Sequence, residues 1–272
     1  GVDDACEMHL FALGAVPSPL PTLDEFEASA CQVHSSSTEQ GMLEDLERWW
    51  LRTDPDIVTG WNINGFDIPY LCTRYMQLLG RLPRFGRRGR DMRSFTLVNG
   101  AKRASCHGRV VADLLDVWRK DYVERSYKLD NVAAAHLQAS KAPVAYSEIR
   151  TLQSTAAGRA RMGTYCVKDS YLVWKLGKVR KKWINALEMS NVTFVPLQQL
   201  FSRGQQWKVF SLISHYAYNA SPRIFIPDTP PPSDAGYEGA VVITTLPGFY
   251  RECVSTRDFA SLYPSIMIAF NM

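Results

Sequence analysis

The sequence lacks the features that mark several broad classes of protein. Its six cysteines are scattered, with no C-x-x-C pair and no Cys/His cluster at zinc-ligand spacing, so we expect no zinc or iron–sulfur site. No apolar run approaches the ~20 residues needed to cross a bilayer. The N-terminus has neither the basic start nor the apolar core of a signal peptide. We therefore expect reduced thiols, no membrane association and an intracellular location, for a protein of cellular or viral origin.

Charge of one sign is also not in large excess. The 272 residues carry a formal net charge of +4, which is compatible with a polyanionic partner but is common in proteins that bind no nucleic acid. The hydrophobic fraction of 46% is enough to bury a core in one large or two smaller domains. Because the chain begins at Gly1 and stops at Met272 inside an apolar stretch, we expect it to be a piece of a longer protein.

Apolar periodicity predicts strands that alternate with helices over the first part of the chain. The expected strands are residues 9–13, 31–33, 57–61 and 110–117, and the expected helices are 42–52, 68–79 and 126–137. Thr38 or a nearby serine should cap the first helix and Ser126 the third, and Gly80 should end the second. This alternation is typical of an α/β domain.

The rest of the chain is expected to be mostly helical. Long helices are expected at residues 158–188 and 205–218, followed by a proline-rich linker at 228–234. Residues 81–93 are rich in Arg and Gly, which favours a flexible solvated loop over a patch that tracks phosphates.

One acid near the end of the chain, Asp258, follows an apolar and small run at residues 253–256 that we expect to be a buried strand. Pro264 suits the first turn of a helix, which should continue as a buried helix through residue 269. An acid at such a corner can hold a divalent cation. The alternative is an aspartate that only caps the helix.

Two further acids stand at comparable positions. Asp67 lies in a loop between an expected strand and an expected helix, where N-capping is the alternative role. Tyr165 and Asp169 are four residues apart in a helical stretch, so they share one face, which Leu172 and Leu176 extend inward. Because an unpaired buried carboxylate is costly, a metal ion would be a suitable partner for Asp169.

Taken in order, these stretches resemble one family. N-x-x-x-F-D at residues 62–67, Y-x-x-x-D at 165–169 and D-x-x-S-L-Y-P-S-I at 258–266 are similar to the second and third exonuclease motifs and the first polymerase motif of family B DNA polymerases. S-Y-K-L at 126–129 and S-R-G-Q-Q-W-K at 202–208 resemble the eukaryotic delta branch and its large-virus relatives. Departures from that branch are found at Phe270 and Met272.

The resemblance implies a fold and a function. Residues 1–190 would form an RNase H-like 3′–5′ exonuclease domain that lacks its first strand, 191–227 a helical connector, and 228–272 a linker and the start of the polymerase palm. The whole protein would be a replicative DNA-directed DNA polymerase with proofreading, in the nucleus or at a viral replication site. It would use Mg²⁺ in two-metal sites, with DNA primer-template, dNTPs, a sliding clamp or viral processivity factor and accessory subunits as partners.

The resemblance also assigns roles to residues of the nuclease part. Asp67 and Asp169 would be metal ligands, and Tyr165 would position the attacking water. Asn62 and Phe66 would contact the single-stranded 3′ end, Phe66 by packing on a base or sugar.

In the polymerase part, Asp258 and the carbonyl of Phe259 would bind Mg²⁺ and the triphosphate, which the N–H groups of Ser261 and Leu262 would cradle. Tyr263 would lie under the sugar and exclude a 2′-hydroxyl. Y-E-G-A at residues 237–240, with Tyr237 and Gly239, is similar to a motif that contacts the template strand.

Some expected parts are not found in the sequence. Residues 3–7 do not match the Asp-x-Glu of the first exonuclease motif, so the remaining acids should not hold two metals and the piece itself should be inactive. We expect D-x-E shortly upstream, and K-x-x-x-N-S-x-Y-G followed by D-T-D downstream. Asp113, on a nearby strand, is expected to have a structural role.

Two alternative functions stay open. The first is a family B homologue whose nuclease is inactive and whose role is that of a scaffold, against which Asp67, Tyr165 and Asp169 argue. The second is a stand-alone nuclease, against which the linker and the Asp258 stretch argue.

Overall fold

A computed structural model describes residues 6–22, 28, 30–139, 144–225, 239 and 241–271 of the protein. The chain divides into two compact units, Gly1–Ile226 and Pro227–Met272, and each is described by itself. Tyr237, the stretch at 228–234 and the residues at 1–5 lie outside the described residues. The domain boundaries expected from the sequence stay a prediction.

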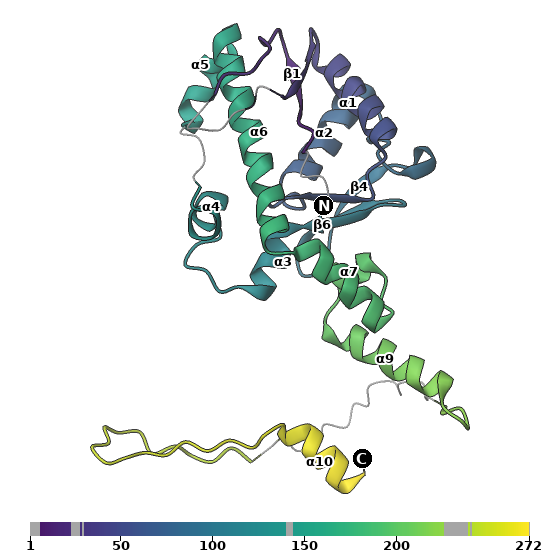
Figure 1. Cartoon of the computed structure of the whole chain (residues 1–272), viewed down its shortest axis with the longest axis vertical. Coiled ribbons are helices and arrows are strands. Elements are labelled where there is room, and N and C mark those ends of the chain that lie inside the picture. Colours follow the sequence, from purple (N-terminus) through teal and green to yellow (C-terminus); the bar gives the residue numbers. More distant parts are fainter. Residues whose placement is uncertain are drawn as a thin grey trace. The chain divides into compact units, whose positions relative to one another are not determined.

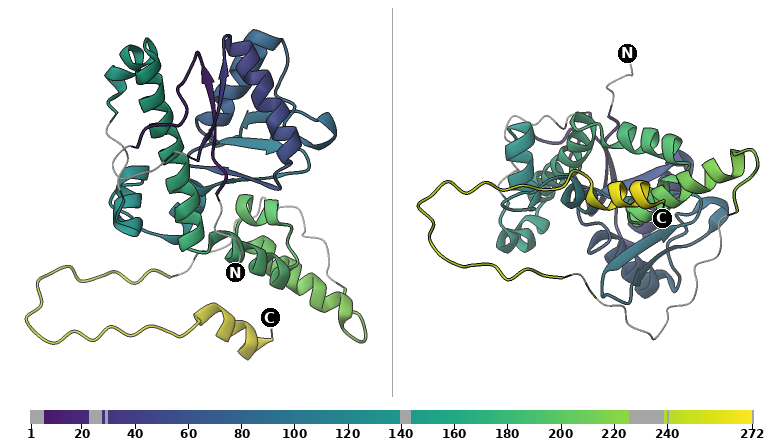
Figure 2. Two further views of the ribbon diagram at one scale, coloured as in Figure 1. Left: turned by 45° about the horizontal axis from the view of Figure 1, so that its top comes forward. Right: turned by 90° about the horizontal axis from the view of Figure 1, so that it is seen from below.

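The larger unit has a mixed α/β architecture. Its elements in chain order are β1 (His9–Leu13), β2 (Gln32–Ser36), α1 (Glu39–Thr53), β3 (Ile57–Gly60), α2 (Asp67–Leu79), β4 (Met92–Thr96), β5 (Lys102–Cys106), β6 (Val110–Asp113), α3 (Leu114–Asp121), α4 (Leu129–Leu137), α5 (Ile149–Gln153), α6 (Ala156–Val179), α7 (Lys182–Thr193), α8 (Leu197–Ser202) and α9 (Gln205–Asn219). The described strands form parallel pairs β1–β2 and β3–β6 and an antiparallel pair β4–β5. Figures 1 and 2 show the strands between α1 and α2 on one side and α4 and α6 on the other.

Several predicted elements are confirmed. Strand β1 has the predicted bounds, and α1, α2 and α9 each differ from prediction by no more than three residues at an end. The hydroxyl of Thr38 caps α1 by accepting a hydrogen bond from the N–H of Gly41 at 3.1 Å. Gly80, with φ of +66°, ends α2 in the left-handed conformation that glycine adopts without steric cost.

Two predicted elements are too long. The strand expected at residues 110–117 ends at Asp113, because the carboxylate of Asp113 accepts the N–H of Leu115 at 3.1 Å and starts α3. The helix expected at 158–188 breaks at Lys181, which has a φ of +50°. After the break the ammonium of Lys182 lies over the ring of Tyr122, 4.2 Å from its centroid. This contact with Tyr122, the residue that follows α3, is one that periodicity does not encode.

The third helix start and the arginine-rich loop also differ from expectation. Helix α4 begins at Leu129, and Ser126 only accepts an N–H from Lys128, at 3.4 Å, outside the helix. Arg81 forms an ion pair with Glu47 at 2.8 Å. Arg87 likewise pairs with aspartates at the corner between α1 and β3. Arg81 is therefore held by a carboxylate of α1, which a flexible loop does not predict, whereas Arg87 is ion-paired but its side chain is still 40% exposed, in agreement with a solvated loop.

The core lies on both faces of the strands. One cluster of described residues joins α1 and α2 to β4, β5 and β6, and includes Tyr75, which is fully buried. A second cluster joins α3, α4 and α6 around Trp118, and a third lies between α6 and β1. No disulfide joins the six cysteines, all of which are described. Among the described residues, no helix is long and apolar enough to span a membrane.

A side chain from α8 completes the edge of β6. Gln198 accepts a hydrogen bond from the N–H of Val111 at 2.8 Å, and its amide group donates to the carbonyl of the same residue at 3.3 Å. The amide therefore bonds Val111 as a neighbouring strand would.

The smaller unit contains α10 (Leu262–Phe270). Pro264 lies in its first turn, as predicted. The strand expected at 253–256 is wrong, because residues 241–271 contain no described strand with which it could pair. The helix is not buried either: Ile268 is 83% exposed, since the described residues of this unit supply no layer to cover it.

Tyr75 provides a test of the packing between α1 and α2. Its hydroxyl donates to the carbonyl of Leu43 at 2.6 Å in the core, so Tyr75→Phe should lower the free energy of unfolding by about 1 kcal/mol. Tyr70→Phe is a matched control on the same helix, because that side chain is 55% exposed and should change stability little. Urea unfolding followed by circular dichroism measures both, and equal effects would contradict the buried hydrogen bond.

Candidate functional site

The candidate site is built around the loop that joins β3 to α2. Strands β3 and β6 are parallel, with Gly60 opposite Asp113, so their carboxyl ends lie at the same edge of the sheet. Asp113 is 5% exposed. Its Oδ1 accepts the N–H of Asn62 at 2.9 Å, and its Oδ2 accepts the N–H of Asn64 at 3.0 Å. Together with its bond to α3, the carboxylate holds the loop against the end of β6.

The electrostatics of Asp113 agree with a structural role. Burial raises the pKa of its carboxyl above the ordinary value, and the N–H groups of Asn64 and Asn62 oppose that shift. A buried carboxylate is tolerated when hydrogen bonds replace its lost water. Here backbone N–H groups supply those bonds.

Asn64 is a second anchor that the sequence analysis missed. Its side chain is buried, and its Oδ1 accepts the N–H of Ala104 on β5 at 3.0 Å. Its Nδ2 lies 3.4 Å from Oδ2 of Asp116, which Arg103 contacts at 2.8 Å. The available signal in the sequence was weak: a polar residue directly after the apolar Ile63.

Asp67 is the first residue of α2 and does not cap it. Phe66 occupies the N-cap position, and its side chain makes no capping hydrogen bond within the described residues, so the capping alternative for Asp67 is wrong. The residue is exposed as a whole, yet partial desolvation of its carboxyl raises the pKa of Asp67, and its own N–H opposes the shift. Phe66 is 66% exposed and points away from the core.

Asp169 and Tyr165 lie on α6. Thr164, next to Tyr165, is fully buried and its hydroxyl donates to the carbonyl of Pro21 at 2.9 Å. Leu172 is also buried, and Oδ1 of Asp169 lies out of contact with solvent. The inward face predicted for Asp169 is thus observed, and α6 packs against both β1 and β3.

The described residues do not complete a metal site. No group of three or more His, Cys, Asp or Glu side chains among them is close enough to hold an ion. Carboxylates such as those of Asp67 and Asp169 are the right kind of ligand for Mg²⁺. Their number does not suffice, so the metal ions expected from the sequence stay a prediction.

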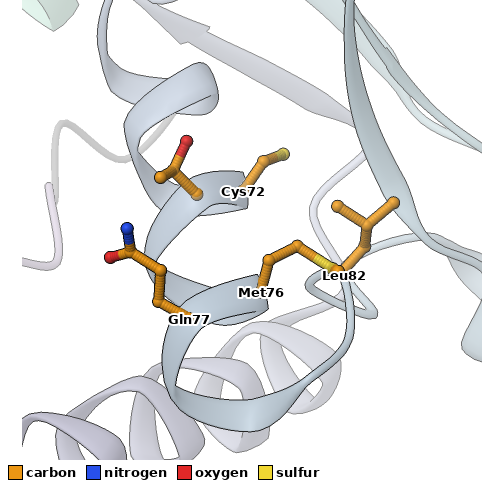
Figure 3. Close-up of a pocket in the computed structure, with 5 residues that line it drawn as sticks. Cys72, Met76, Gln77 and Leu82 are labelled. Carbon is orange, nitrogen blue, oxygen red and sulfur yellow. The ribbon is translucent and has the colours of Figure 1, made fainter.

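The pocket in Figure 3 is a separate feature. It has a volume of about 360 Å³ and is lined by Cys72, Thr73, Met76, Gln77 and Leu82. None of the five lining residues carries a carboxylate. Four of them lie on α2 at residues 72–77, whereas Asp67 begins that helix. This pocket is therefore not the candidate metal site.

In the smaller unit, the Asp258 stretch forms an exposed corner. Oδ1 of Asp258 accepts the N–H of Phe259 at 2.9 Å. Ser261 has a φ of +51° at the start of α10, directly before Leu262. Tyr263 is 76% exposed, and Gly239 is exposed as well.

Comparison with protein families matches two parts of the chain. Residues 3–132 match the description "DNA polymerase family B, exonuclease domain", and residues 195–272 match "DNA polymerase family B". Together the matches cover most of the sequence, and the chain belongs to the family B DNA polymerases. Asp67 and Asp113 lie in the first match and Asp258 in the second, whereas Asp169 lies between them.

Curated relatives are consistent with this assignment. The chain is 37% identical over 247 residues to the DNA polymerase delta catalytic subunit of Caenorhabditis elegans, 39% over 253 residues to that of Drosophila melanogaster, and 37% over 255 residues to that of Schizosaccharomyces pombe. These alignments cover 86%, 89% and 89% of this chain and 23% of each relative. The chain thus spans less than a quarter of the length of these proteins.

The role of Asp113 can be tested by Asp113→Asn. An asparagine amide offers one oxygen and places an NH₂ group against backbone N–H donors, so at least one donor loses its acceptor. We expect the free energy of unfolding to fall by about 2–3 kcal/mol. Asp56→Asn is the matched control, because the Asp56 side chain is 82% exposed and its ion pair with Arg87 is at the surface, so that the change in stability should be less than about 0.5 kcal/mol. Urea unfolding measures both, and equal losses would rule out the anchoring role.

Proposed function

We propose that the protein containing this chain is a replicative DNA-directed DNA polymerase that proofreads with a 3′–5′ exonuclease. The supporting observation is the order of the two family matches on one chain, with an acid-bearing loop held at the sheet edge in the first and the Asp258 corner in the second. The parallel β3–β6 pair with helices on both sides supports an RNase H-like fold for residues 1–190. Residues 191–227 would be the connector and 228–272 the start of the palm.

In the nuclease part, we assign Asp67 and Asp169 as carboxylates that contribute to a Mg²⁺ site, with further ligands from outside the described residues. Tyr165, one helical turn before Asp169, positions the attacking water. Asn62 and Phe66 contact the unpaired 3′ end. The exposed ring of Phe66 supports its contact with the strand, and the exposed position of Asp67 at the start of α2 supports its access to a metal ion.

In the polymerase part, Asp258 and the carbonyl of Phe259 bind the metal and the triphosphate, and the N–H groups of Ser261 and Leu262 contact phosphate oxygens. Tyr263 excludes the 2′-hydroxyl. The exposure of the corner and the left-handed Ser261 at the helix start support this assignment, because N–H groups there have no partner within the helix. Tyr237 and Gly239 contact the template strand.

The partners follow from the activity. They are DNA primer-template, dNTPs, a sliding clamp or viral processivity factor and accessory subunits, in the nucleus or at a viral replication site. The chain carries 31 Lys and Arg against 27 Asp and Glu, so a polyanionic substrate meets no net repulsion.

Replacing Asp169 and Asp258 by alanine, one at a time, tests the proposal. In the complete protein, Asp169→Ala should lower 3′–5′ digestion of single strands by about 10²-fold or more, the scale for removing a group that acts in the transition state, and leave primer extension intact. Asp258→Ala should do the reverse. Each variant is the control for the other, in gel assays of labelled primers. Undiminished digestion by Asp169→Ala would refute its assignment, and an unaltered protein that neither digests nor extends would favour the scaffold alternative.

Tyr263→Ala tests the discrimination between sugars. Removing a ring that occupies the space of the 2′-hydroxyl should reduce the preference for dNTPs over rNTPs by roughly 10- to 100-fold. Phe270→Ala, a ring that is 72% exposed on the same helix, is the control and should retain the preference. Single-nucleotide incorporation rates measure this ratio, and an unchanged ratio for Tyr263→Ala would reject the role.

A further inference from the structure

Two aromatic rings on α2 form an exposed pair beside Asp67. Phe66 is 66% exposed and Tyr70 is 55% exposed. Their ring centroids are 6.2 Å apart and their planes differ by only 8°. The N–H of Tyr70 donates to the carbonyl of Phe66 at 3.0 Å, so the first turn of the helix fixes their spacing.

Packing against the core of the described residues does not account for this pair. The next tyrosine on α2, Tyr75, is fully buried and hydrogen-bonded, and Trp50 stacks on the buried Phe85. Tyr70, in contrast, presents more than half of its surface to solvent. Adjacent large rings left in water mark a surface that binds something apolar or flat.

The charges near the pair indicate stacking instead of charge attraction. Arg74, one turn after Tyr70, is held by both carboxylate oxygens of Glu39, at 2.6 and 2.5 Å. Its charge is therefore neutralised within the protein. What Tyr70 offers a ligand is the face of its ring.

We infer that Tyr70 is a second stacking contact for the unpaired 3′ strand, and this inference rests on the proposed nuclease function. The 3′ terminus must reach Asp67, so the ring of Phe66 receives a base at the end of the strand and Tyr70 receives the neighbouring base on its 5′ side. The ring centroids are 6.2 Å apart, wider than the roughly 3.4 Å between stacked bases, so each ring receives one base of an extended single strand whose bases are no longer stacked on each other. Stacking accepts every base, as an activity that removes any mispaired nucleotide requires.

Binding of the complete protein to a fluorescein-labelled single-stranded hexanucleotide tests the inference. Anisotropy is measured with EDTA present, so that the strand stays intact. Tyr70→Ala and Tyr70→Leu should each raise Kd about tenfold, whereas Tyr70→Phe should stay within twofold of the unaltered protein. Met76→Ala, a residue that is 49% exposed on the same helix, is the control and should also stay within twofold. Thermal unfolding checks that all variants are folded.

Two further measurements separate stacking from other contacts. The slope of log Kd against log salt concentration should be the same for Tyr70→Ala and the unaltered protein, because no phosphate contact is lost. Hexanucleotides with a single abasic position should include one that binds the unaltered protein as weakly as Tyr70→Ala binds the intact strand. With that strand, Tyr70→Ala should cause no further loss.

Each other outcome overturns the inference. Equal affinity of Tyr70→Ala and the unaltered protein excludes any contact. Tyr70→Phe as weak as Tyr70→Ala indicates a hydroxyl contact, and a shallower salt slope indicates a phosphate contact. A loss that persists with every abasic strand indicates a general disturbance of α2. If the unaltered protein binds no single strand, the proposed function fails and the inference fails with it. If the unaltered protein binds and Tyr70→Ala binds equally well, the inference alone fails.

Discussion

A single buried carboxylate organises the nuclease part of this chain. Asp113 ends β6, accepts the N–H that starts α3, and binds two N–H groups of the loop that leads from β3 into α2. Each bond compensates part of the cost of burying the charge. As a result, the positions of Asn62 and of the start of α2 are set by the end of a strand some fifty residues further along the chain.

The loop between β3 and α2 contains buried residues that anchor it, and it is followed at the start of α2 by residues that face solvent. Ile63 and Asn64 are buried and fix the loop to the core and to β5, whereas Phe66 and Asp67 face solvent. A side chain that must meet a ligand is more effective when its backbone cannot move, because little ordering remains to be done on binding. Asp67 is placed at the border between the two: its residue is exposed, yet partial burial of its carboxyl raises the pKa of that group.

The sequence predicted elements that local rules determine. Helices α1, α2 and α9 follow from apolar periodicity, and the ends at Thr38 and Gly80 follow from capping chemistry. The break at Lys181 was not predicted in this way, because apolar periodicity does not encode contacts such as that of Lys182 with Tyr122, the residue that follows α3. The motif residues were predicted from the resemblance to family B motifs, but Asn64 acts through Ala104 on a strand that was not predicted, so its role required the fold.

The contact between Gln198 and Val111 bears on where this folding unit can be divided. Val111 lies two residues before Asp113, on the strand whose end holds the β3–α2 loop. A polypeptide cut before α8 would leave the edge of β6 with an N–H and a carbonyl open to water or to another chain. The helical part that contains α8 and the mixed part that contains β6 are therefore not independent of each other, because Gln198 of α8 bonds the backbone of β6.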